Sequence, residues 1–455
     1  MSSSPKPTGR LPLPALLALA TAVFVTSLTE TLPAGVLPGL STDLGVAEAA
    51  AGQTVTVYAL GTALTAVPLA ARTADWRRKR LLLTSVAGFA AANTVTAASS
   101  SYALTMGARF LAGVAAGLAW ALLAGYARRI APTHLQGRAV AVAMTGIPLA
   151  LSLGVPAGTF LGEAVGWRAA FTAMTVIAVG LLGWIALAVP DLPGERSGGR
   201  APVARTLKVP GVLPVLAVTF MLVLAHTVLY TYVAAYLGHL GLGGSTGLVL
   251  LVFGVASLAG IWFTGRYIDR RLRALTLGGT VLVAAGAAAL AVPAGSTALV
   301  LVAAGLWGLG WGGAPTLLQT AVADAGGDAA DTAHTMLVSL WNAAMAAGGL
   351  AGGLLLDGLG AGALPWSVLL LLVPVVAVVT GARAHGFPAP RRFPDDPHAP
   401  DHPAAAPDHP AAAHDGHVPA TRLRDSELPA PDLAAPVLPA QDLPVQDLPA
   451  HRGHS

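Results

Sequence analysis

The strongest constraint on this chain is the recurrence of apolar segments of about 20 residues along most of its 455 residues. A helix of that length crosses a hydrocarbon layer about 30 Å thick. The chain is 55% hydrophobic and 11% charged, whereas soluble domains are about 25% charged. Because lipid offers the backbone no hydrogen-bond partners, the spanning elements are expected to be helices. The sequence therefore predicts an all-α polytopic membrane protein.

We expect twelve transmembrane helices in two pseudo-symmetric six-helix bundles. Their expected positions are residues 12–37, 50–71, 81–99, 103–126, 137–162, 168–189, 211–236, 246–265, 274–293, 297–321, 331–356 and 364–383. The expected organisation is a cytoplasmic stretch at 1–11, a first bundle at 12–190, a polar cytoplasmic linker at 191–210, a second bundle at 211–385 and a cytoplasmic tail at 386–455.

Two pairs of short motifs indicate that the second half repeats the first. "ARTAD" at 71–75 corresponds to "GRYID" at 265–269, and "GVPAG" at 154–158 corresponds to "GGLAG" at 348–352. Both pairs share an offset of 194 residues, as the numbering shows. Parallel repeats of six helices are a transporter architecture, with the substrate site near the midplane between them.

The positive charges predict the orientation. Of the 26 Lys and Arg residues, all except Arg109 and Arg168 lie in the termini or in loops on one side of the expected spans. Because cytoplasmic loops are enriched in Lys and Arg, we expect both termini in the cytoplasm. These charges sit in short loops, so the basic balance does not indicate nucleic-acid binding.

The tail differs from the rest of the chain. Residues 388–455 hold 15 of the 34 prolines and seven of the twelve histidines. Such a segment cannot bury enough apolar surface to fold, so we expect disorder. The tail histidines could bind a metal, but proline-rich spacing fixes no coordination geometry, and we expect a low-complexity tail with no metal site. No cofactor is expected either, and the chain contains no cysteine.

Glu30 stands almost alone as an acidic side chain inside an expected span. An ionised carboxylate at membrane depth costs at least about 2.5–3.5 kcal/mol. Burial favours its protonated form and a nearby cation favours its charged form, so such a group can carry a proton. Arg109, about six residues into the fourth span, is predicted at a similar depth, roughly 9–10 Å below the outer surface. The two could form a pair that breaks when Glu30 is protonated, although a fixed salt bridge or snorkelling is an alternative.

Four motifs, one of them present twice, lie at matching places in the twelve-span pattern and resemble the major facilitator superfamily, and within it the bacterial drug:proton antiporters with twelve helices. They are "TETLPAGVLPGLSTDLGV", the pair of loop motifs "ARTADWRRKRLLL" and "GRYIDRRLRAL", "GARFLAGVAAGLAW" and "GIPLALSLGVPAGTFLGEAVGWRAAF". The first loop motif departs from the family pattern at Ala71 and Trp76. The resemblance covers about residues 10–385.

The resemblance implies roles for several residues. It implies that the first and fourth helices line the central cavity, and that Asp75, Asp269 and Arg270 lock one conformation. Solvated loop charges are the alternative for the two aspartates. The fifth-helix motif implies a packed hinge that seals one end of the cavity, formed by Gly146, Gly154, Pro156 and Gly158, although ordinary helix packing would also explain the glycines.

Aromatic and amide side chains inside the spans are the candidates for substrate contact, because they suit flat amphipathic molecules. They are Tyr58, Asn93, Trp120, Tyr230, Trp307, Trp311, Gln319, Trp341 and Asn342. His226 in the seventh span could be a second proton site or a buried, hydrogen-bonded neutral histidine.

Together these features predict a monomeric, proton-coupled efflux transporter of the inner membrane, which exports small organic molecules or drugs by alternating access. A dedicated exporter of a sugar, a nucleoside or a self-made antibiotic is the first alternative, and a membrane sensor that moves nothing is the second. We expect no enzyme, because the sequence has no metal-ligand cluster, nucleophile elbow or phosphate loop.

Overall fold

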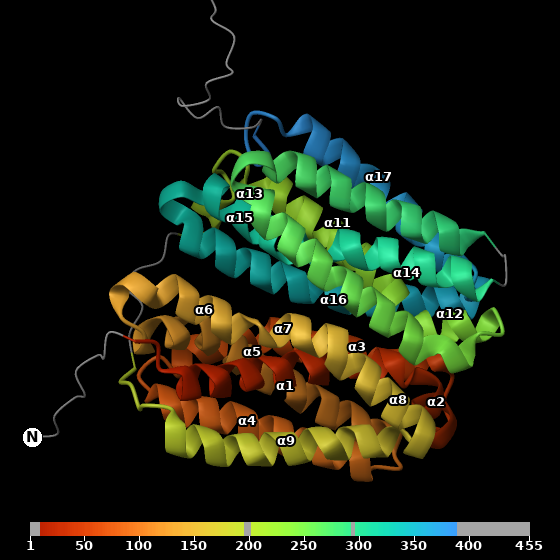
Figure 1. Ribbon diagram of the computed structural model, residues 1–455, viewed down its shortest axis with the longest axis horizontal. Coiled ribbons are helices and arrows are strands. Elements are labelled where there is room, and N and C mark those ends of the chain that lie inside the picture. Colours follow the sequence, from red (N-terminus) through yellow and green to blue (C-terminus); the bar gives the residue numbers. More distant parts are fainter. Residues whose placement is uncertain (1–9, 195–201, 293–295, 389–455) are drawn as a thin grey trace, which may run out of the picture. The chain divides into compact units, whose positions relative to one another are not determined.

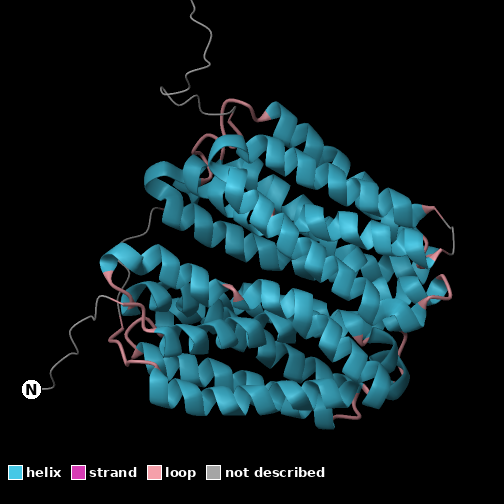
Figure 2. Cartoon of the chain, viewed as in Figure 1, coloured by secondary structure: helices cyan, strands magenta, loops and turns pink. Residues whose placement is uncertain are grey.

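The computed structural model describes residues 10–194, 202–292 and 296–388. All regular elements in these three ranges are helical, as Figure 2 shows. The tail predicted at 386–455 lies almost entirely outside the described residues, as do most of the N-terminal stretch and part of the linker.

The first half of the chain forms nine α-helices and one π-helical turn, coloured red to yellow in Figure 1. Their bounds are α1 Leu13–Gly35, α2 Leu37–Leu44, α3 Glu48–Arg72, α4 Arg78–Ala98, α5 Tyr102–Ile130, α6 Gln136–Met144, α7 Gly146–Leu149, the π-helical turn Ala150–Gly154, α8 Val155–Val165 and α9 Trp167–Ala188. The segment α6–α8 corresponds to the predicted fifth span.

The second half follows a short helix, α10 Val203–Thr206, and is coloured green to blue. Its helices are α11 Val212–Thr231, α12 Val233–His239, α13 Thr246–Ala291, α14 Thr297–Gly312, α15 Ala314–Gly326, α16 Ala330–Leu359 and α17 Ala363–Gly381.

The described helices account for twelve crossings. Nine segments are long and apolar enough to span a membrane, and two of these, Gly243–Ala291 and Thr297–Leu359, are each long enough for two crossings. Helix α3 adds another, because its 25 residues span about 38 Å as a helix.

The predicted eighth and ninth spans share the label α13, in which two helices follow one another across a kink, without a longer loop between them. Its only residue with non-helical angles is Arg271, with φ −138° and ψ 32°. The backbone of Phe253 contacts Gly308, while Gly286 contacts Trp307. Residues 253 and 286 would lie about 50 Å apart in a straight helix. Both flank the same turn of α14, so α13 folds back at Arg271 and crosses twice.

Equivalent helices of the two halves pack in the same way. A Cβ on Gly154 would lie 3.2 Å from Leu28 of α1. A Cβ on Gly348, which is 194 residues later, would lie 2.7 Å from Thr227 and 3.0 Å from the carbonyl of Leu224, both in α11. The small residues thus permit the same close approach in both halves, which agrees with the pseudo-symmetry predicted from the sequence motifs.

The two halves meet along two interfaces. In the first, α3 packs on α16; in the second, α8 and the π-helical turn pack on α13. A Cβ on Gly349 would lie 2.3 Å from Thr56 Oγ1, and one on Gly254 would lie 2.4 Å from the Cα of Ser152. Helices α2 and α12 contact each other at one end of these interfaces, which we call the α2–α12 end.

Candidate functional site

Glu30 lies on α1, one turn before the helix ends. The chain has a proline at position 33, α1 ends at Gly35, and Val36 leaves the helical region with φ −115° and ψ 16° before α2 begins. After this break a second helix, α2, extends to Leu44, so helical structure runs beyond the end predicted at residue 37. Glu30 is partly exposed, whereas its neighbour Thr29 is fully buried.

Arg109 is the largest charged side chain buried in the described residues, with 1% of its surface exposed. Its Nε donates to the carbonyl of Thr54 at 3.3 Å, and its guanidinium carbon lies 4.9 Å from the ring centre of Tyr58. Both Nη atoms are buried without a hydrogen-bond partner. Only Nε of the guanidinium is therefore hydrogen-bonded. Unpaired buried donors are costly, and more so when they carry charge.

Glu30 and Arg109 do not form the ion pair that the sequence suggested, because neither Nη atom contacts a carboxylate. Glu30 nevertheless lies near Arg109 and Tyr58 of its own half and near Tyr230 of the other half. The hydroxyl of Tyr58 donates to the carbonyl of Thr26 at 3.1 Å, which fixes the ring between α1 and Arg109. Glu30 therefore lies within electrostatic reach of residues from both halves.

Aromatic side chains from four helices gather beside Tyr230. The imidazole of His226 stacks on Trp311 with ring centres 3.5 Å apart and planes 4° apart. Other ring centres lie 5.1 Å from His226 for Tyr230, 5.9 Å for Phe253 and 5.4 Å for Trp307. We call this group, together with Trp341, the aromatic cluster; Trp341 lies 5.7 Å from Trp311.

His226 is hydrogen-bonded inside the cluster. The indole Nε1 of Trp307 lies 3.2 Å from Nδ1 of His226. Indole is a donor only, so Nδ1 accepts and carries no proton. This geometry favours the neutral, hydrogen-bonded histidine over the second proton site.

Of the other predicted contact residues, Asn93, Trp120 and Gln319 lie apart from this cluster, whereas Asn342 adjoins it. Asn93 is fully buried in the first half and donates to Thr29 Oγ1 at 3.2 Å. Trp120 packs against the core of the first half, and Gln319 is exposed. Asn342 lies beside Trp341 on α16 and donates to the carbonyl of Val338 at 3.0 Å.

The fifth-helix glycines face α1. A Cβ on Gly146 would lie 2.2 Å from the carbonyl of Ala20, and one on Gly158 would lie 2.5 Å from Leu32. Pro156 is buried directly after the π-helical turn Ala150–Gly154, so the helix changes its winding between the two contacts.

The loop residues predicted to lock a conformation are exposed. Asp75 lies in the loop after α3, where its backbone approaches Gly194, and both Asp75 and Arg270 have interacting partners. Asp269 lies in α13, two residues before the non-helical Arg271, and not in a separate loop as the sequence suggested.

The sequence did not predict two of the residues that take part in the site. Phe253 joins the aromatic cluster from α13, and Thr54 supplies the carbonyl that holds Arg109. Neither stands out in the sequence, because Phe253 is one of many apolar residues and Thr54 acts through its backbone.

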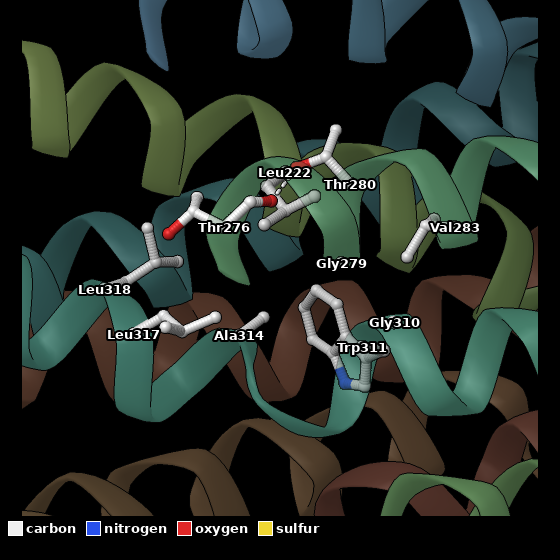
Figure 3. A pocket seen from close by; sticks show the side chains of 10 residues that line it. All are labelled: Leu222, Thr276, Gly279, Thr280, Val283, Gly310, Trp311, Ala314, Leu317 and Leu318. Atoms are coloured by element: carbon white, nitrogen blue, oxygen red, sulfur yellow. Dashed lines mark hydrogen bonds between the residues drawn. The ribbon is translucent and has the colours of Figure 1, made fainter. Parts of the chain in front are cut away.

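Figure 3 shows a pocket within the second half, which shares Trp311 with the aromatic cluster. Trp311 is part of its wall, and the remaining lining comes from α11, α13, α14 and α15. The hydroxyl of Thr280 donates to the carbonyl of Thr276 at 2.7 Å, within α13. The polar atoms are thus paired locally, and the walls are otherwise apolar.

The fold and the buried polar residues define a helical transporter built from two related halves. A profile of the Major Facilitator Superfamily matches residues 19–337. The chain belongs to this superfamily of membrane transporters, which are not enzymes, as the sequence resemblance predicted.

The names of similar proteins indicate more than one function. The transcription regulatory protein OpdE of Pseudomonas aeruginosa is 31% identical over 81% of this chain and 94% of OpdE. The purine ribonucleoside efflux pump NepI of Salmonella paratyphi B is 30% identical over 80% of this chain and 93% of NepI. The crystal structure of the human organic anion transporter MFSD10 (TETRAN) aligns with a TM-score of 0.61 and 18% identity, covering 81% of this chain and 99% of that one. This last likeness concerns the fold.

Proposed function

We propose that the protein exports planar organic molecules across the bacterial inner membrane by alternating access, in exchange for protons. The observation that carries the proposal is the location of Glu30, within electrostatic reach of Arg109 on one side and of the aromatic cluster on the other. A carboxylate in such surroundings can couple its charge to the occupancy of the neighbouring site.

Glu30 would bind the incoming proton. When it is ionised, it attracts the Arg109 guanidinium, whose Nη atoms have no other protein partner. Protonation removes this attraction and so changes the relative stability of the two conformations, which is all that a coupling ligand can do. The membrane potential adds about 2.3 kcal/mol per charge per 100 mV.

A planar aromatic ring is the substrate feature that the aromatic cluster would recognise. Offset stacking on Trp341 or Tyr230 suits a flat heterocycle. The hydroxyl of Tyr230 is buried without a partner and could bond to a polar edge of such a ring. The similarity to NepI makes purine ribonucleosides the first class to test, ahead of drugs, sugars and self-made antibiotics.

The distribution of Lys and Arg supports an orientation with both termini in the cytoplasm. The α2–α12 end would then face outward. We take the monomer as the transporting unit, because the two six-helix halves of one chain together hold Glu30 and the aromatic cluster.

A membrane sensor is the second candidate, and its support is the similarity to OpdE, which is named a regulatory protein. A sensor would bind its ligand without moving it. Transport assays therefore separate the two candidates directly.

The proposal is tested by measuring accumulation of purine ribonucleosides and of a panel of drugs in an efflux-deficient bacterial host. Cells expressing wild type, Glu30→Gln and an empty vector are compared at matched protein levels. We expect wild type to lower accumulation of at least one planar compound and Glu30→Gln to lose that effect. Export by both forms would remove the role of Glu30, and binding without export would favour the sensor.

A further inference from the structure

Tyr232 joins the two halves at the α2–α12 end. It lies at the break between α11 and α12, with φ −111° and ψ 19°, and it is fully buried. Its ring fills the space left by glycines of both halves. A Cβ would lie 2.2 Å from the ring atoms if placed on Gly52 of α3, and 2.7 Å if placed on Gly352 of α16.

The Tyr232 hydroxyl is the centre of a hydrogen-bond group that spans the α3–α16 interface. It lies 2.8 Å from the carbonyl of Gly349 and 3.2 Å from the carbonyl of Ala49. It also accepts from Nε2 of Gln53 at 3.1 Å, and the same nitrogen lies 3.3 Å from the carbonyl of Gly349. One phenol thus connects α3 of the first half with α16 of the second.

These contacts do not belong to the site around Glu30. The group includes no substrate candidate predicted from the sequence, and its donors and acceptors are paired with one another. If the halves separate at this end, Tyr232 must leave Gly52 and its polar partners Ala49 and Gln53, all in α3, at the same time. Buried polar groups that lose their partners are costly, so the group favours the joined arrangement.

We propose that Tyr232 is a positioning residue that holds the α2–α12 end closed, and that opening of this end requires the hydroxyl to leave Ala49 and Gln53 of α3. This inference rests on the proposed alternating-access transport for its role in a cycle. Its structural content, a closed end stabilised by one hydroxyl, stands independently of transport.

The absence of cysteine in the chain allows a direct test by disulfide cross-linking. A Cβ on Gly349 would lie 3.5 Å from the Cβ of Thr56, across the halves. A Cβ on Gly162 would lie 3.7 Å from the Cβ of Val36, within the first half. Both values fall in the range of disulfide geometry, about 3.5–4.5 Å. Thr56→Cys with Gly349→Cys is therefore the reporter pair, and Val36→Cys with Gly162→Cys is the control pair.

Each pair is combined with Tyr232→Phe, which keeps the ring and removes the hydroxyl. Membranes are oxidised for increasing times, and remaining thiols are labelled with a maleimide after denaturation. We expect Tyr232→Phe to slow cross-linking of the reporter pair by about threefold to tenfold, the range for loss of a buried hydrogen bond. The control pair should cross-link at an unchanged rate. Equal rates for the reporter pair with and without the hydroxyl would overturn the proposal.

If Tyr232→Phe also slows the control pair, the fold has changed, and Gln53→Leu replaces it in the same comparison. That variant removes the amide donor and leaves Tyr232 in place. It should slow the reporter pair alone, and an unchanged reporter rate would refute the proposal. Because cross-linking needs no substrate or proton gradient, its outcome is separate from that of the export assay.

Discussion

Replacing Gly146 with alanine should weaken the packing of the fifth helix on α1. The new Cβ would lie 2.2 Å from the Ala20 carbonyl oxygen, whereas ordinary contacts begin at 3.4 Å, so the helices must separate locally by about 1 Å. Both nearest atoms, the Ala20 oxygen and the Phe24 nitrogen, belong to the backbone of α1 and cannot move aside alone. Such overpacking costs about 1–3 kcal/mol.

Two matched variants separate this effect from helix propensity, which favours alanine over glycine by up to about 1 kcal/mol. In Gly158→Ala the new Cβ would lie 2.5 Å from the end of the Leu32 side chain. Because that side chain can rotate away, the loss of unfolding free energy should be smaller. Gly180→Ala in α9 meets nothing within 4 Å and should not destabilise.

The free energy of unfolding is measured by titrating the detergent-solubilised protein with SDS and following fluorescence of its nine tryptophans. The expected order of stability is Gly180→Ala, then Gly158→Ala, then Gly146→Ala. If Gly146→Ala were as stable as Gly180→Ala, the fifth helix would not approach the backbone of α1 as closely as described, and the reasoning would fail.

Two further substitutions test buried and exposed polar contacts in the same unfolding assay. Trp307→Phe leaves Nδ1 of His226 without its donor, so we expect a loss of about 1–3 kcal/mol; unchanged stability would contradict the hydrogen bond. Asp43→Asn removes an ion pair with Arg168 whose side chains are 45% and 37% exposed, so we expect a loss of at most about 1 kcal/mol. A loss well above that would mean the pair is shielded from solvent.

Helix number and type were predictable, because each crossing requires an apolar segment of similar length. The fold-back in α13 was not predictable in detail. The loop motif contains Arg266, Asp269, Arg270 and Arg271, which suggested a non-helical loop, yet only Arg271 departs from helical angles. A single residue can reverse the chain where solvent satisfies the freed backbone groups, and composition does not reveal this.

The site was predictable only in part. Counting residues from helix ends estimates depth but not the direction in which a side chain points. Glu30 and Arg109 are accordingly close enough to interact electrostatically, yet they are not bonded to each other. Trp307 and Trp311 are four residues apart and share a helix face, whereas His226 and Phe253 reach them through tertiary packing that no local pattern encodes.

The central claim is that Glu30 couples substrate movement to protons, and purified protein in liposomes tests it most directly. Movement of an exported compound is measured with and without an imposed pH gradient, for wild type and Glu30→Gln. Substrate exchange without a gradient serves as the measure of intact binding and conformational change. The account predicts that the gradient accelerates wild type only, while both forms exchange substrate. A Glu30→Gln protein that still responds to the gradient as wild type does would contradict it.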